Sequence, residues 1–90
     1  MALRILYEGH VQGVGFRWAV KQIAKGFDVV GSVANLTDGR VELQVDGALN
    51  EIRDFVQAIA ESDLRSHIRG TTETELDHAL STRGFEIRHE

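Results

Sequence analysis

The sequence predicts an α+β fold, because strand-like and helix-like patterns of apolar residues follow one another along its 90 residues in the order βαββαβ. Apolar residues alternate with polar ones in the strand patterns and recur every three to four residues in the helical patterns. A short strand pattern then closes the chain. This order is typical of the ferredoxin-like sandwich, a mostly antiparallel sheet with two helices packed on one face. We expect residues 1–90 to form a single domain of this kind.

The first half of the chain contains three strand patterns and one helix pattern. Residues 3–8 alternate as a strand, and residues 18–25 follow a helical apolar stripe. Two further strands, at 28–36 and 40–46, flank a turn at 37–39. The last of these strands is expected to point its apolar residues inward, namely Val41, Leu43 and Val45, and its polar residues outward, namely Arg40, Glu42, Gln44 and Asp46.

The second half of the chain predicts one helix and two strands. The helix runs from about Leu49 to Glu61, with Asn50 near its N-terminal cap. Residues 66–76 follow a weaker strand pattern, and residues 84–88 form a short strand at the end. The residues that share one phase in the weaker strand are Ile68, Gly70, Thr72, Thr74 and Leu76.

Composition and charge restrict the classes of function. The net charge of −4 and the scattered basic residues argue against a nucleic-acid surface, which would need a basic stripe. The chain has no cysteine, so disulfides, thiolate nucleophiles and cysteine metal sites are excluded. Its four histidines lack metal-ligand spacing, and we expect no metal or other cofactor. The sequence contains no signal peptide and no membrane-spanning stretch, so we expect a cytoplasmic protein without a membrane partner.

One stretch, residues 9–17, carries three glycines between a strand pattern and a helix pattern. Glycine permits a sharp turn and lets a ligand approach the backbone N–H groups closely. No Ser, Thr, Asp or Asn directly precedes the helix, so the N–H groups of its first turn lack a side-chain cap. Arg17 adds a fixed positive charge and a planar fork of hydrogen-bond donors. These features predict a small oxyanion cradle, and a phosphoryl group is the ligand that fits it best.

The cradle does not fit the common nucleotide-binding patterns. It lacks the Gly-Lys-Ser/Thr ending of a P-loop, and Trp18 stands where the last glycine of G-x-G-x-x-G belongs. From the residues alone, a tight strand-to-helix turn with a surface arginine explains the stretch equally well. Trp18 is expected to pack at the start of the helix, and His10 to be a solvated loop residue.

The loop Gly9-x-Val11-Gln12-Gly13-Val14-Gly15-Phe16-Arg17 closely resembles the signature of the acylphosphatase family, small enzymes that hydrolyse carboxyl-phosphate anhydrides. A second stretch, residues 31–41 with Gly47 beyond it, is similar to the family's other motif. Residues 84–88 resemble a common family ending, so the resemblance covers essentially the whole chain. Ser32 departs from the second motif, where the family usually has an aromatic residue.

The resemblance implies a metal-free hydrolase whose substrate is an acyl phosphate and whose product and inhibitor is inorganic phosphate. It implies that the Arg17 guanidinium binds the phosphoryl group and that the Asn35 amide holds the attacking water. The backbone N–H groups that it assigns to the phosphoryl oxygens are those of Gln12, Gly13, Val14, Gly15, Phe16 and Arg17. Without the resemblance, Asn35 would be interpreted as a turn residue at the end of a hairpin strand.

Three other functions stay open at this point. A ferredoxin-like binding module would hold a phosphate or an acyl phosphate without turning it over. The acylphosphatase-like domain of hydrogenase-maturation carbamoyltransferases acts on carbamoyl phosphate, but such a domain is expected to precede further domains, and none follows residue 90 here. An RNA-binding domain of this fold is disfavoured by the acidic charge and by the lack of an exposed aromatic pair on the central strands. We expect a monomeric enzyme of the acylphosphatase kind.

Overall fold

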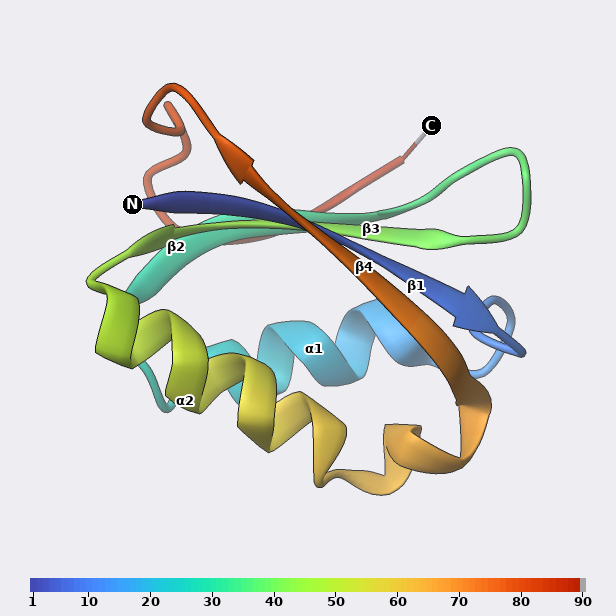
Figure 1. Ribbon diagram of the computed structural model, residues 1–90. Coiled ribbons are helices and arrows are strands. Elements are labelled where there is room, and N and C mark those ends of the chain that lie inside the picture. Colours follow the sequence, from blue (N-terminus) through green and yellow to red (C-terminus); the bar gives the residue numbers. More distant parts are fainter. Residues whose placement is uncertain (90) are drawn as a thin grey trace.

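The computed structural model describes residues 1–89 and contains a five-stranded sheet with two α-helices packed on one of its faces (Figure 1). Its elements are, in chain order, β1 (Ala2–Gly9), α1 (Phe16–Ala24), β2 (Val29–Asn35), β3 (Val41–Gly47), α2 (Leu49–Ala60), the 3₁₀ segment η1 (Asp63–His67), β4 (Ile68–Leu76) and β5 (Phe85–Arg88). Within these described residues, no helix has both the length and the apolar character needed to cross a membrane.

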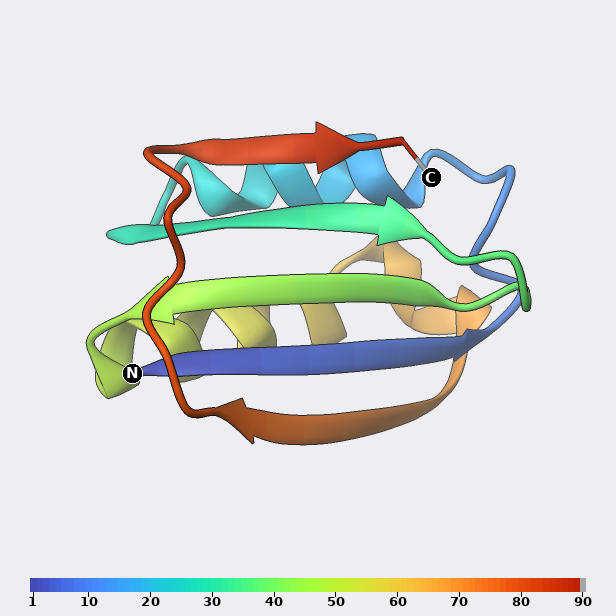
Figure 2. The same cartoon turned by 90° about the horizontal axis from the view of Figure 1, so that it is seen from above.

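The strands lie side by side in the order β4-β1-β3-β2-β5 (Figure 2). The first four are antiparallel to their neighbours, whereas β5 runs parallel to β2, which makes the sheet mixed. This arrangement confirms the ferredoxin-like fold with an additional C-terminal strand. The connection from β4 to β5 crosses the sheet face opposite the helices (Figures 1 and 2), where the Leu80 N–H donates a hydrogen bond to Asp46 Oδ2 at 2.8 Å.

The hydrophobic core fills the space between the sheet and the two helices. Val41, Leu43 and Val45 of β3 are fully buried there, which confirms the alternation that the sequence predicts. The helix residues that are buried against the sheet are Phe16, Val20, Ala24, Ile52, Phe55 and Ile59. Because β1 and α1 both pack into this core, the loop that joins them has two fixed ends.

Two details differ from the sequence prediction. Ala48 is the N-cap of α2, so Asn50 lies inside the first turn, and no side chain of the described residues caps this helix. The register between β1 and β4 shifts between Glu8 and Gly9, where β4 has one extra residue, Arg69, without a partner on β1. Ile68 therefore packs against the core, and the single phase predicted for the fourth strand holds only from Gly70 onward.

Glu42 of β3 lies on the face opposite the helices, as predicted, but it is only 6% exposed rather than solvated. Its carboxylate accepts hydrogen bonds from Arg4 Nε and Arg88 Nη2, both at 2.5 Å. Arg88 Nε also donates to Ser32 Oγ at 2.8 Å. Burial alone would raise the pKa of Glu42, but the hydrogen bonds from the two arginines outweigh it and hold this pKa below its usual value. We call Arg4, Ser32, Glu42 and Arg88 the open-face cluster.

Candidate active site

The loop at residues 10–15 joins β1 to α1 and has a backbone that requires glycine at two positions. Gly13 and Gly15 both have a φ of 78°, in the left-handed region. Gly15 is also the N-cap of α1 and gives the first turn no side-chain hydrogen bond. A Cβ at either glycine would meet no described atom within 4 Å, so backbone conformation, rather than crowding, requires glycine here. The N–H groups that a side-chain cap would satisfy are thus available to an anion.

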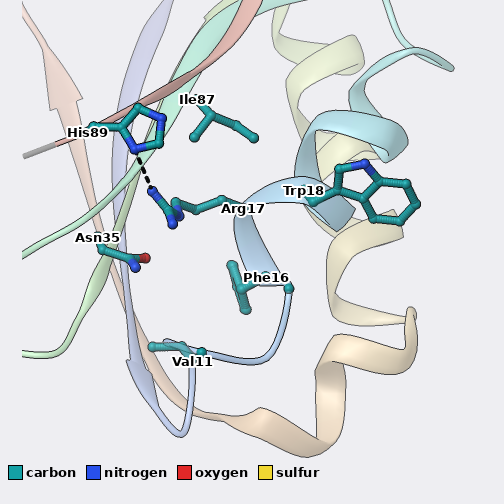
Figure 3. Close-up of a pocket in the computed structure, with 9 residues that line it drawn as sticks. Val11, Phe16, Arg17, Trp18, Asn35, Ile87 and His89 are labelled. Carbon is teal, nitrogen blue, oxygen red and sulfur yellow. Dashed lines mark hydrogen bonds between the residues drawn. The ribbon is translucent and has the colours of Figure 1, made fainter.

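A pocket of about 250 Å³ opens at the N-terminal end of α1 (Figure 3). It brings together Arg17 from the first turn of α1 and Asn35 from the last position of β2. Its lining residues are Val11, Gly13, Gly15, Phe16, Arg17, Trp18, Asn35, Ile87 and His89. Among the site residues expected from the sequence, Gln12 and Val14 are the two that belong to the adjoining loop without lining this pocket in the described structure.

Gln12 connects the loop to the strand that carries Asn35. Its side-chain Nε2 donates hydrogen bonds to the backbone carbonyl oxygens of Leu36, at 2.8 Å, and of Arg40, at 2.9 Å. These carbonyls flank the β2–β3 turn, which begins directly after Asn35. Both hydrogens of the amide are used in this way, so the separation between the loop and the end of β2 is fixed. From the sequence, only a backbone role was expected for Gln12. Its side-chain role could not be predicted, because both acceptors are distant along the chain.

The C-terminal strand supplies one wall of the pocket. Ile87 of β5 and His89 just beyond it line the pocket, and His89 Nδ1 lies 3.5 Å from Arg17 Nη1 (Figure 3). Because β5 pairs with β2, these two residues stand beside the strand that ends in Asn35. The sequence did not predict that these two residues line the pocket. It indicates only that they follow the alternation of a short strand.

The sequence predictions for two further residues near the loop, Trp18 and His10, can be compared with the structure. Trp18 was expected to pack at the start of the helix, but the residue is 64% exposed, it lines the pocket, and its indole points away from Arg17 (Figure 3). His10 is exposed, as expected, and its ring centroid lies 5.9 Å from that of His67. Within the described residues, His10 does not line the pocket that contains Arg17.

The charges around the pocket favour an anionic ligand. None of its nine lining residues is acidic, and Arg17 has no carboxylate within 4.0 Å among residues 1–89. The turn acid Asp38 is paired with Arg40 at 2.7 Å instead, and hydrogen bonds from Arg40 lower the pKa of Asp38. Over the same described range, no group of three or more His, Asp or Glu residues could hold a metal ion. The arrangement is therefore suited to binding an oxyanion through Arg17 and backbone N–H groups.

Comparison with known proteins assigns the chain to a family. The acylphosphatase family model matches residues 3–87. The acylphosphatase of Lacticaseibacillus paracasei is 35% identical over 88 residues, which cover 97% of this chain and 95% of that relative. The crystal structure of acylphosphatase from Bacillus subtilis has 34% identity and a TM-score of 0.86, with 97% of each chain covered. The crystal structure of full-length HypF in its phosphate- and nucleotide-bound form has 31% identity and a TM-score of 0.86, over 97% of this chain and 11% of that one. The chain belongs to the acylphosphatase family.

Proposed function

We propose that the pocket at the N-terminus of α1 hydrolyses acyl phosphates to a carboxylate and inorganic phosphate. The observation that carries this proposal is that Arg17 and Asn35, distant in the sequence, line one pocket beside two left-handed glycines. An uncapped helix terminus and a guanidinium suit a phosphoryl group. Family membership supports the same reaction, because relatives named acylphosphatase match almost the whole chain.

The chemistry of an acyl phosphate explains why so few side chains suffice. The leaving group is a carboxylate whose conjugate acid has a pKa of about 4 to 5, by analogy with side-chain carboxyls. It therefore leaves as an anion at neutral pH and needs no proton from a general acid. The remaining tasks are to bind the phosphoryl oxygens, to offset their charge and to align a water molecule in line with the leaving oxygen.

In the proposed mechanism, the Arg17 guanidinium and the backbone N–H groups of residues 12–17 hold the phosphoryl group. The Asn35 amide orients a water molecule for direct in-line attack on phosphorus, with no covalent enzyme intermediate. The new bond from water to phosphorus forms as the bond to the acyl oxygen breaks, and a phosphoryl oxygen accepts the proton of the water. Gln12 keeps the two halves of the site at a fixed separation through its hydrogen bonds to Leu36 and Arg40.

Turnover of benzoyl phosphate in excess chelator tests the activity. We expect the purified chain to hydrolyse this substrate at an undiminished rate when the chelator is added. The matched binding measurement is calorimetric titration with inorganic phosphate. A folded chain that binds phosphate but leaves benzoyl phosphate intact would be a binding module, and the proposed function would be wrong.

Hydrolysis in ¹⁸O-labelled water tests which atom the water attacks. In-line attack on phosphorus places the label in inorganic phosphate and none in benzoate, and mass spectrometry of the two products distinguishes the outcomes. Label in benzoate would show that the water attacks the carbonyl carbon. That result would contradict the role given to the cradle, which is built to stabilise charge on phosphoryl oxygens.

A further inference from the structure

His89 is a pocket residue to which the mechanism above gives no role. Its Nδ1 lies 3.5 Å from Arg17 Nη1, and this is the only hydrogen bond that the Arg17 side chain makes within residues 1–89 (Figure 3). No carboxylate of the same range is within ion-pair distance of Arg17. Within the described residues, His89 is therefore the one side chain that is hydrogen-bonded to the Arg17 guanidinium.

A neutral imidazole is well suited to holding an arginine that must bind an anion. A guanidinium only donates hydrogen bonds, so Nδ1 of His89 must be the acceptor in this contact. The contact therefore indicates the tautomer that carries its proton on Nε2. A carboxylate at this position would hold Arg17 more strongly, but it would offset the positive charge and compete with the phosphoryl group. The imidazole restrains the guanidinium and leaves its charge available.

The open-face cluster fixes the strand that brings His89 to the pocket. β5 has four residues and lies at the edge of the sheet, so the chain beyond it would fray without support. Arg88 supplies that support on the opposite face, where it donates to Ser32 Oγ at 2.8 Å and to Glu42 at 2.5 Å. Because successive residues of a strand point to opposite faces, anchoring Arg88 there directs His89 toward the pocket. Ser32, which departs from the aromatic residue usual in the family, is thus one of the anchors.

We propose that His89 is a positioning residue, placed by Arg88 and Ser32, which orients the guanidinium of Arg17 toward the phosphoryl group. Its effect on turnover rests on the proposed function. Its effect on phosphate binding does not, because inorganic phosphate occupies the cradle without any reaction. The two proposals can therefore be tested separately.

The test compares His89→Phe, which keeps a ring but removes the acceptor, with His89→Gln, which restores an acceptor. Calorimetric titration with inorganic phosphate is the principal readout. We expect phosphate to bind about 3–10-fold more weakly to the Phe variant, because binding must then also order the long Arg17 side chain. The Gln variant should recover most of this loss. The matched control is Glu86→Gln, an exposed position on β5, the strand that directly precedes His89, and this variant should bind phosphate like the wild type. Circular dichroism checks that all three variants are folded.

Two results would overturn the role of His89. Unchanged phosphate affinity in His89→Phe would show that Arg17 needs no hydrogen-bond acceptor at this position. An equal loss in the Phe and Gln variants would show that the acceptor is not what supports phosphate binding. A wild-type chain that binds phosphate but does not hydrolyse benzoyl phosphate would refute the proposed function, and the phosphate titrations would still decide the role of His89. A wild-type chain that binds no phosphate would overturn both.

Discussion

Tyr7 of β1 carries a polar atom into the core without a partner. Its side chain is 2% exposed, and its hydroxyl makes no hydrogen bond within residues 1–89. The ring is well placed, with its centroid 5.1 Å from that of Phe16. Burial raises the pKa of Tyr7 well above its usual value, and the negative charge of Glu73 raises it further. The hydroxyl has thus lost its hydration without gaining a hydrogen bond, which is unfavourable.

Tyr7→Phe should therefore stabilise the fold, by about 1 kcal/mol, because it removes an unsatisfied hydroxyl and keeps the ring contact. Urea unfolding at pH 7, followed by circular dichroism, measures the change. Tyr7→Leu is the control that loses the ring, and it should destabilise the protein by leaving a cavity. Lower stability in the Phe variant would show that the hydroxyl has a partner, such as a bound water molecule.

At the scale of the elements, the β1–α1 loop depends on backbone conformation at Gly15. Ala at this position would have to adopt a φ of 78°, although its Cβ would meet no described atom. The strain should lower stability by about 1–2 kcal/mol and displace the first-turn N–H groups, weakening phosphate binding about tenfold. Urea unfolding and phosphate titration measure the two effects.

Gly70→Ala is the matched control for this loop prediction. A Cβ added at Gly70 of β4 would also meet no described atom within 4 Å, but the φ of this glycine is not positive. The Ala variant should bind phosphate like the wild type. Equal behaviour of the two Ala variants would mean that the left-handed conformation at Gly15 does not matter to the cradle.

The elements could be predicted because each carries a local signal. The alternation in β3 and the apolar stripe of α1 result from burial on one side, which gives each element its period. Glycine content and the missing cap are local too, so the glycine-rich turn and the uncapped start of α1 could be predicted. Gln12, by contrast, bonds to carbonyls that only the folded chain brings close. Glu42 is buried because arginines from two other strands cover it, and such contacts leave no period in the sequence.

For the molecule as a whole, the open-face cluster links β1, β2, β3 and β5 and should make stability depend on pH. The pKa of Glu42 is lower in the folded chain than its unfolded value of about 4.3. Its contribution is therefore fully present above that value and is lost as the pH falls through the folded pKa.

Glu42→Gln should accordingly be less stable than the wild type at pH 7, by about 1–2 kcal/mol, since two half-exposed arginines lose a charged partner. The difference should be smaller at pH 3 than at pH 7, because the stability that this carboxylate contributes is lost as the pH falls below its unfolded pKa. Urea unfolding at both pH values measures it, with the exposed Glu86→Gln as the control on the same face. A difference that stays constant from pH 7 to pH 3 would show that the charge of Glu42 is not what stabilises the cluster.

In the proposed function, Arg17 binds the phosphoryl group while Asn35 holds the water. The most direct measurement is kcat for benzoyl phosphate together with the inhibition constant of inorganic phosphate, for Asn35→Ala and Arg17→Lys, with the exposed Arg53→Lys as the control. We expect Asn35→Ala to lower kcat roughly 10²-fold and to leave phosphate inhibition nearly unchanged. Arg17→Lys should lose both turnover and inhibition by phosphate, because a point charge does not replace the guanidinium fork. Arg53→Lys should keep both. Near-normal turnover in Arg17→Lys, or loss of phosphate inhibition in Asn35→Ala, would contradict this division of roles.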